Sequence, residues 1–168
     1  MKSRAHVMTV AFALCMAASL FAQSGKPAVL SADELKQSVP STFFFRGQSA
    51  TVQTRNSGGL RIGKDSLVLA ALVDTGGYAT DVKQKYQGLL ITEVKINIGG
   101  SSLAPGEYGF GFNADGKFRV MDVGANDLLA TDIKSDDSLK RPVPLKLSEE
   151  NGGYRLYAGR KYVVIKVE

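Results

Sequence analysis

The stretch GEYGFGFNADGKFRVMDVG, from Gly106 to Gly124, has the composition of a β-hairpin and sets the fold class of the chain. Asn113–Gly116 predicts a type I turn followed by a glycine with positive φ, the three-residue hairpin loop that ends in a G1 bulge. This turn fixes which residues lie opposite one another on the two strands. The predicted pairs are Asn113 with Lys117, Phe112 with Phe118, Gly111 with Arg119, Phe110 with Val120, Gly109 with Met121 and Tyr108 with Asp122.

The two faces of this hairpin differ in chemistry. The apolar face carries Tyr108, Phe110, Phe112, Phe118 and Val120. On the other face, Gly109 and Gly111 lack side chains and leave a shallow trough beside Arg119 and Met121. Either Arg119 and Met121 lie across the glycines, or a ligand or partner strand fills the trough. These four residues are therefore the candidate ligand-binding residues.

The glycines of this stretch also have the G-x-x-G-x-G spacing of a phosphate-binding loop. A loop of that kind needs a helix directly after its glycines, so that the helix N-terminus receives the phosphate. Here the turn is followed by KFRVMDV, which has the composition of a strand. The pattern therefore excludes a nucleotide loop.

Strand patterns fill most of the remaining chain. SATVQTR (49–55) and LRI (60–62) alternate around a predicted turn at Asn56–Gly59, SLVLAALV (66–73) is apolar throughout, and LLITEVKINI (89–98) reads as one strand. Residues 142–168 predict three short strands with turns at 151–152 and 158–160. Strands spaced in this way predict an all-β fold, an antiparallel β-sandwich or barrel.

Two helices interrupt the strands. LSADELKQSVP (30–40) predicts an N-terminal helix that has Ser31 as N-cap, Glu34 as its capping-box partner and Pro40 as its end. ATDVKQKYQG (79–88) predicts a short internal helix with Thr80 as its cap and Gly88 as its end.

The first residues have the order of a secretory signal peptide. Lys2 and Arg4 precede an apolar run from Val7 to Phe21, and Ala22 offers a small residue at the cleavage position. The run of about 15 residues is short for a membrane-spanning helix, which is the alternative and needs about 20. We expect a signal peptide at 1–22, a leader and short helix at 23–42 and a single β-rich domain at 43–168, located in the periplasm or secreted.

Removal of the signal changes the composition in a useful way. The single histidine and the single cysteine, His6 and Cys15, both lie in it. The mature chain therefore lacks an imidazole base, a thiolate nucleophile and a disulfide. It also lacks the histidine and cysteine ligands from which zinc and copper sites are built, and we expect no metal and no cofactor. Without Lys2 and Arg4, the 21 basic residues fall to 19 against 16 acidic ones, a net charge of about +3 that does not indicate nucleic-acid binding.

One motif has the chemistry of a catalytic site. ALVDTGG (71–77) resembles the active-site loop of retropepsin-like aspartic peptidases, in which an apolar strand ends in Asp-Thr-Gly. The resemblance implies a homodimer in which Asp74 of each copy shares a proton, with Thr75 and Gly76 shaping the loop. Gly77 departs from the alanine or serine that is usual in the family. The alternative interpretation is a turn at a strand end, since all three residues favour turns.

The mature chain as a whole resembles small exported bacterial proteins of unassigned function, through FFFRGQSATVQTRNSGG (43–59) and LKRPVPL (139–145). That resemblance implies no activity. We expect a non-catalytic binding or structural module of the cell envelope, with the Asp74 peptidase as the alternative. The expected partner is a small ligand or an envelope protein, without nucleic acid and without a membrane span after signal removal. The sequence leaves the oligomeric state open.

Overall fold

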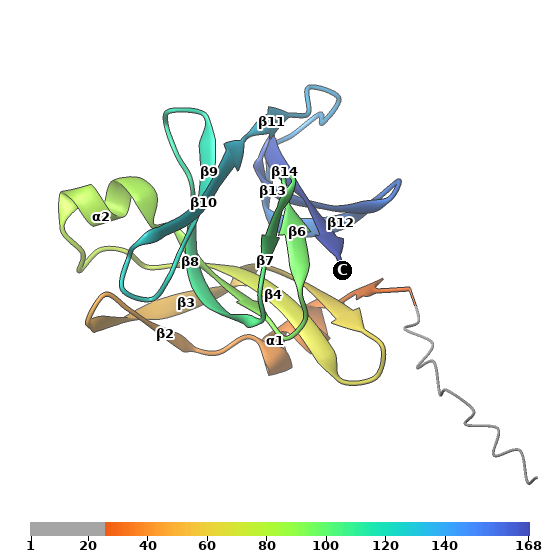
Figure 1. Cartoon of the computed structure of the whole chain (residues 1–168), viewed down its shortest axis with the longest axis horizontal. Coiled ribbons are helices and arrows are strands. Elements are labelled where there is room, and N and C mark those ends of the chain that lie inside the picture. Colours follow the sequence, from red (N-terminus) through yellow and green to blue (C-terminus); the bar gives the residue numbers. More distant parts are fainter. Residues whose placement is uncertain (1–25) are drawn as a thin grey trace, which may run out of the picture.

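The computed structural model describes residues 26–168, which form two packed antiparallel sheets (Figure 1). The strands of the larger sheet are β1 (Ala28–Val29), β2 (Thr42–Phe45), β3 (Gln48–Ile62), β4 (Ser66–Val73), β5 (Gly88–Thr92), β8 (Gly106–Phe112), β9 (Lys117–Met121) and β10 (Asp127–Asp132). They lie in the order β1-β3-β4-β5-β8-β9-β10, and β2 pairs with β3.

The smaller sheet contains the C-terminal strands. Its members are β6 (Ile96–Ile98), β7 (Ser101–Leu103), β11 (Lys134–Ser135), β12 (Val143–Glu150), β13 (Gly153–Gly159) and β14 (Lys161–Val167). They lie in the order β12-β13-β14-β6-β7, and β11 pairs with β14. The predicted all-β antiparallel fold is therefore confirmed, with the sandwich rather than the barrel as its form, and the three C-terminal strands are confirmed as well.

The main hydrophobic core lies between the two sheets. It combines side chains such as Leu60, Phe110 and Phe118 from the larger sheet with Leu156 and Ile165 from the smaller one, all of them fully buried. The aromatic face of the β8–β9 hairpin belongs to this core, because the rings of Phe110 and Phe118 stack with their centroids 5.5 Å apart. The predicted apolar face therefore holds the two sheets together.

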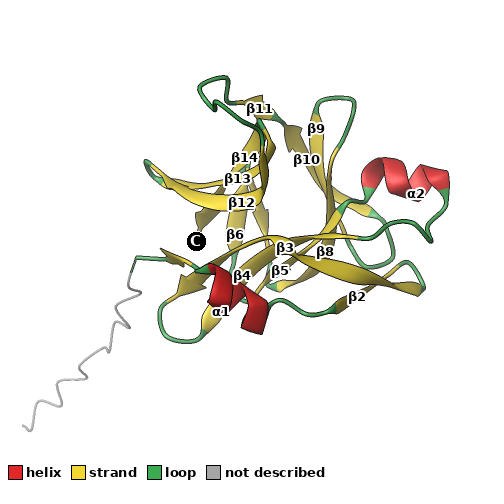
Figure 2. Ribbon diagram, turned by 180° about the vertical axis from the view of Figure 1, so that it is seen from behind, coloured by secondary structure: helices red, strands yellow, loops and turns green. Residues whose placement is uncertain are grey.

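A second core covers the opposite face of the larger sheet. Helices α1 (Ala32–Ser38) and α2 (Thr80–Lys85) lie on this face together with β2, as Figure 2 shows. The capping box of α1 forms as predicted, with the backbone N–H of Ser31 donating to Glu34 at 2.8 Å and the N–H of Glu34 donating to the Ser31 hydroxyl at 3.4 Å. No helix within residues 26–168 is both long enough and apolar enough to cross a membrane.

The caps predicted for α2 are wrong. Thr80 is already the first helical residue, and Ala79 holds the N-cap position with an extended backbone. Gly88 does not end the helix but begins β5. A Cβ atom at Gly88 would lie 2.4 Å from the carbonyl oxygen of Ala71, so the strand pairing requires glycine here.

The predicted turn at Asn56–Gly59 is also wrong, because β3 runs through it as one bent strand. Its pairing with β4 shifts between Gln53 and Ser57, which makes a bulge in the strand. A Cβ at Gly58 would lie 2.5 Å from the backbone nitrogen of Leu147. The glycine therefore serves the close approach of β12 rather than a turn.

The segment 89–98 divides between the two sheets instead of forming one strand. β5 ends at Thr92, whose hydroxyl donates to the Val94 carbonyl at 2.6 Å. The N–H of Glu93 donates to the Leu67 carbonyl at 2.9 Å, and the chain then enters the smaller sheet as β6. The sequence alternation continues across this corner, which is why the pattern alone indicated a single strand.

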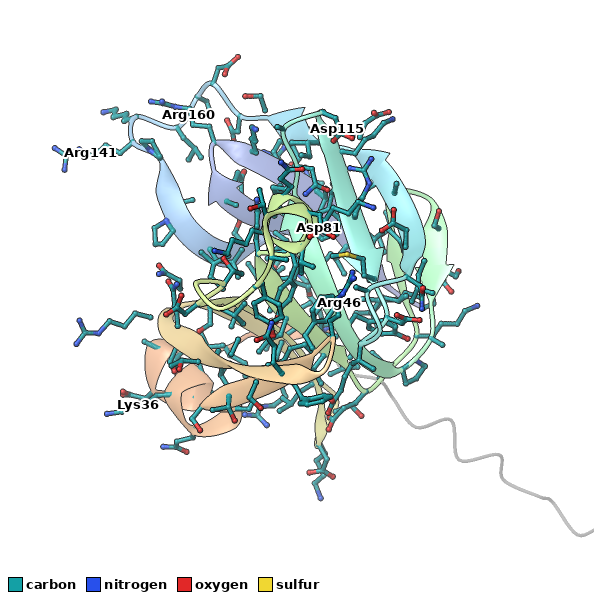
Figure 3. All side chains as sticks on the ribbon, turned by 90° about the vertical axis from the view of Figure 1, so that its left-hand side faces the viewer. Lys36, Arg46, Asp81, Asp115, Arg141 and Arg160 are labelled. Carbon is teal, nitrogen blue, oxygen red and sulfur yellow. The ribbon has the colours of Figure 1, made fainter. Side chains whose placement is uncertain are left out.

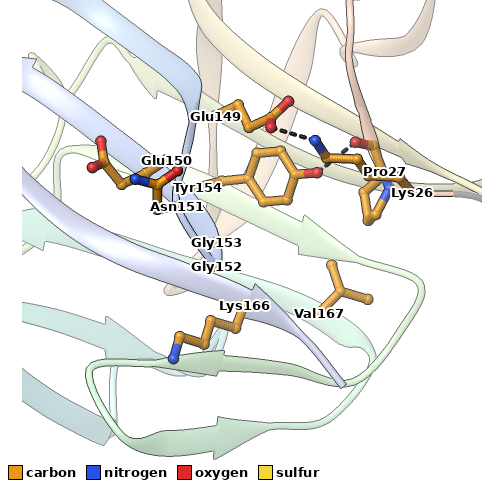
Figure 4. A pocket seen from close by; sticks show the side chains of 10 residues that line it. All are labelled: Lys26, Pro27, Glu149, Glu150, Asn151, Gly152, Gly153, Tyr154, Lys166 and Val167. Atoms are coloured by element: carbon orange, nitrogen blue, oxygen red, sulfur yellow. Dashed lines mark hydrogen bonds and ion pairs between the residues drawn. The ribbon is translucent and has the colours of Figure 1, made fainter.

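The predicted leader is ordered over the part that the structure describes. The ammonium of Lys26 pairs with Glu149, and the Tyr154 hydroxyl donates to the Pro27 carbonyl, beside a hollow of about 420 Å³ (Figure 4). β1 then pairs with β3. Residues 26–42 are thus part of the same folded unit as the strands, whereas the predicted signal peptide lies outside the described residues.

Candidate functional site

The β8–β9 hairpin has the predicted register. Gly109, Phe110, Gly111 and Phe112 lie opposite Met121, Val120, Arg119 and Phe118. The loop closes with the Asn113 N–H donating to Lys117 at 2.9 Å, and Gly116 has a φ of +78°. The ladder ends at Met121, so the predicted pair of Tyr108 with Asp122 does not belong to it.

The glycine face of the hairpin is not an open trough, because the protein itself covers it. A Cβ at Gly109 would lie 2.4 Å from the ring of Phe45, which comes from β2 and stacks on Tyr86 with centroids 3.9 Å apart. A Cβ at Gly111 would lie 1.9 Å from the carbonyl oxygen of Lys85. The two glycines are therefore contact points for β2 and α2. The protein itself fills the trough, but with the Phe45 ring and the Lys85 carbonyl rather than with Arg119 and Met121 as predicted.

Met121 does not face a ligand site of its own either. It is 1% exposed and belongs to the core beneath β2 and α2. It reaches the floor of a small hollow of about 170 Å³, on the side of the molecule where Figure 3 shows Arg46 and Asp81. Its position is therefore that of a packing residue.

Arg119, by contrast, lines a larger hollow of about 720 Å³ between α2, the tip of the hairpin and the start of β14. The lining residues are Lys83, Gln84, Lys85, Gln87, Phe112, Asn113, Ala114, Asp115, Arg119 and Lys161. Figure 3 looks onto this side of the molecule, with Asp115 and Arg160 at its upper edge. The concave surface thus lies next to the glycine face rather than on it.

Two amide side chains hold α2 against the hairpin. Asn113 is 4% exposed, and its Nδ2 donates to the carbonyls of Gln84 at 2.8 Å and Lys85 at 3.2 Å. Gln87 accepts from the Phe112 N–H at 2.9 Å and donates to the Phe112 carbonyl at 3.1 Å. These bonds satisfy carbonyls at the end of α2 and the outermost backbone groups of β8, and they join the two sides of the wall of the hollow.

Arg119 is fixed by a network of charged groups. Its guanidinium donates to Asp115 at 2.6 and 3.0 Å and to Asn113 Oδ1 at 2.9 Å, and its Nε lies 3.7 Å from Asp127. The side-chain hydrogen bonds from Arg119 lower the pKa of the Asp115 carboxyl to about 2. Asp127 also lies 3.4 Å from the ammonium of Lys85. Arg119 therefore links Asn113 and Asp115 through its hydrogen bonds, and its charge is already balanced by Asp115 and Asp127.

Two other cations of the hollow are available to a ligand. Lys83 and Lys161 are exposed, and neither forms an ion pair with any residue of the described chain. Four cationic side chains and one carboxylate line the hollow, so its lining has a formal charge of +3. The neighbouring Asp127 reduces this to +2. The hollow is therefore a cationic surface with amide and backbone groups between the charges.

The structure places Asp74 in a turn at the end of β4. Asp74 is exposed, and its Oδ1 accepts from the Gly76 N–H at 2.9 Å. Thr75 accepts a bond from the Tyr78 N–H at 3.0 Å, so the motif forms consecutive turns. The contact between Asp74 and Gly76 is that of a turn and needs no catalytic role for Asp74. The peptidase alternative requires a second copy of the chain and stays a prediction.

The sequence indicated Arg119 but missed its neighbours from α2 and β14. Lys83, Asn113 and Lys161 meet only through the tertiary fold, and the glycine at 111, which admits α2, was the one available signal.

Residues 26–168 do not bring three or more His, Cys, Asp or Glu side chains together around a possible metal position. Comparisons of the chain with protein-family models, curated proteins and solved structures give no match.

Proposed function

We propose that the mature chain is a non-catalytic binding module of the cell envelope, exported to the periplasm or beyond, and that the hollow beside Arg119 binds an anionic group. The observation that carries this proposal is the excess positive charge around one concave surface, where Lys83 and Lys161 form no ion pair in the described chain and the lining together with Asp127 has a formal charge of +2. Carboxylates, phosphates and sulfates are the groups that such a lining favours.

The geometry supports binding more than catalysis. Asp115 is held as a carboxylate by Arg119 and is therefore not a proton donor near neutral pH. The ammonium groups of Lys83 and Lys161 are exposed, whereas a nucleophilic lysine is usually desolvated. The lining thus supplies positive charge and hydrogen-bond donors without an activated group.

The proposal is tested with tripolyphosphate, titrated into the mature protein and followed by ¹⁵N chemical shifts. We expect the shifts to concentrate at Lys83, Asn113 and Lys161, and the affinity to fall as salt is added. A charge about 6 Å from an anion contributes about 0.7 kcal/mol in water, so the double variant Lys83→Gln/Lys161→Gln should bind about tenfold more weakly.

The matched control is the double variant Lys64→Gln/Lys166→Gln. Both residues are exposed, neither forms an ion pair in the described chain, and neither lines the hollow. This control removes the same net charge. Equal weakening by the two double variants would show that binding follows overall charge, and the assignment to the hollow would be wrong.

A further inference from the structure

A second surface, on the helix-bearing face of the larger sheet, differs from the hollow in both shape and charge. It is a groove of about 320 Å³ between β2, the end of α1 and the strands β4, β5 and β8. The lining residues are Ser38, Pro40, Thr42, Phe43, Phe44, Leu67, Leu69, Ile91, Glu93 and Glu107. Six of these ten residues are apolar, and the only charged residues among them are the two glutamates.

One wall of the groove is an open strand edge. β2 pairs with β3 on one side, and residues 26–168 provide no strand on its other side. Arg46 and Gly47 both have positive φ, which is the two-residue type I′ hairpin turn, so Phe45 and Gln48 form the hydrogen-bonded pair next to it. In an antiparallel pair the next residue, Phe44, then directs its N–H and C=O away from β3.

The side chains of β2 alternate between buried and exposed, which leaves an exposed aromatic ring beside the edge where an added strand would lie. Phe43 and Phe45 are buried on the sheet, whereas Phe44 is 59% exposed, the most exposed of the large hydrophobic residues described. An exposed aromatic residue on an open edge strand is unusual, since edge strands are normally protected by charge, proline or a covering segment. The edge therefore has the features of an interaction surface.

The floor of the groove has the spacing of strand side chains. Leu69, Ile91 and Glu107 lie opposite one another across β4, β5 and β8, and Leu67 is on the same face. Leu67 and Ile91 remain only half buried although they line an apolar floor. A segment lying along β2 would cover them with every second side chain.

The charge of the groove selects the guest. Glu107 is exposed, and Glu93 is held in place because its Oε2 accepts from the Leu67 N–H at 2.7 Å. No lysine or arginine lines the groove, although the chain as a whole is cationic. A guest with lysine or arginine beside its apolar residues complements this rim, whereas an acidic guest is repelled.

We propose that this groove binds an extended segment of a partner protein in which apolar residues alternate with lysine or arginine. The segment adds a strand to the open edge of β2 and places its apolar side chains on Leu67 and Ile91. Its lysine or arginine side chains leave the backbone on the opposite, solvent-facing side, and their long stems reach around the strand to the carboxylates of Glu93 and Glu107 at the rim. Strand addition of this kind combines main-chain hydrogen bonds with side-chain specificity. The proposal is independent of the anion-binding hollow.

The test uses two synthetic peptides, acetyl-KVKVKV-amide and acetyl-EVEVEV-amide, titrated into the ¹⁵N-labelled mature protein. We expect the lysine peptide to shift the amides of Thr42, Phe44 and Ile91, and the glutamate peptide to bind at least tenfold more weakly. Glu107→Lys should abolish that preference. Asp65→Lys is the matched control, because Asp65 is an exposed acid in the turn between β3 and β4 and does not line the groove.

A second pair of variants tests the edge itself. Phe44→Ser should weaken the lysine peptide at least fivefold, whereas Val29→Ser, which removes another exposed apolar residue from a strand, should leave it unchanged. Both positions are exposed, so unchanged thermal midpoints verify the fold.

Three results would overturn the proposal. The first is equal binding of the two peptides, and the second is a set of shifts confined to another strand edge. The third is self-association of the protein that Phe44→Ser removes, since a second copy would then be the occupant of the edge. The double variant Lys83→Gln/Lys161→Gln should leave peptide binding unchanged. This control distinguishes a failure of the groove proposal from a failure of the anion-binding proposal.

Discussion

Gly111→Ala is expected to loosen α2 from the β8–β9 hairpin and to reduce anion binding at the same time. The added Cβ would lie 1.9 Å from the Lys85 carbonyl oxygen and 3.0 Å from Asn113 Nδ2. Real Cβ atoms essentially never approach closer than 3.0 Å, so the end of α2 must retreat by about 1.1 Å. The obstructing atom belongs to the backbone, and a rotamer change therefore cannot relieve the contact.

The magnitude follows from two costs and one gain. Overpacking of this kind costs about 1–3 kcal/mol. Stretching the bonds from Asn113 to the carbonyls of Gln84 and Lys85 costs about 1–3 kcal/mol more, because these groups are partly buried. Replacing a strand glycine by alanine returns about 0.5–1 kcal/mol. The free energy of unfolding should fall by about 1–5 kcal/mol, which corresponds to about 3–17 °C in Tm for a folded unit of this size.

Urea unfolding followed by far-UV circular dichroism measures this loss as a lower midpoint with an unchanged m-value. Gly77→Ala is the matched control, since its nearest contact would be a Gln48 side-chain oxygen at 3.6 Å and its φ is not positive. The control should stay within about 0.5 kcal/mol of the wild type. Tripolyphosphate affinity should fall in Gly111→Ala only. A Gly111→Ala protein as stable as the control would refute the role of this glycine in docking α2.

Three further predictions concern single residues and the N-terminus. The Arg119 hydrogen bonds hold the folded pKa of Asp115 at about 2, below about 3.9 in the unfolded chain, so their stabilisation is present above about pH 4 and is lost as pH falls toward 2. The difference in urea midpoint between the wild type and Asp115→Asn should therefore shrink across that interval, and a constant difference would contradict the assignment. Asp74→Asn should leave hydrolysis of unfolded protein substrates at pH 4–5 unchanged, whereas a loss of measurable wild-type hydrolysis would favour the peptidase alternative. Mass spectrometry of the exported protein should show a chain that begins at residue 23, and an intact Met1 would rule out cleavage.

Local turn chemistry made much of the fold predictable from sequence. Asn113–Gly116 and Asn151–Gly152 each specify a hairpin within a few residues, and the ladders they predict are present. The capping box at Ser31 is local in the same way. These features need no information from distant parts of the chain, which is why the sequence pattern was sufficient for them.

Apart from the N-cap of α2, which was predicted one residue too late, the errors occurred where distant contacts decide the conformation. Gly58 resembles a turn residue in sequence, but its lack of a side chain is required by Leu147, which is far away in the chain. The corner at Glu93 does not interrupt the alternation of the segment, so nothing in the pattern marked the change of sheet. The candidate site was only partly predictable for the same reason, since Lys83 and Lys161 reach Arg119 through α2 and β14.

The alternating glycines of β8, Gly109 and Gly111, explain why both proposed surfaces exist. Gly109 admits Phe45 and so fixes where β2 crosses the larger sheet, which leaves the edge of β2 beside the acidic groove. Gly111 admits the end of α2 and so brings Lys83 next to the hairpin, which forms the cationic hollow. Because successive strand residues at i and i+2 share a face, both segments dock on the same side of the sheet. The glycines therefore act indirectly, by admitting the segments that form each surface, and neither surface needs a glycine in contact with its ligand.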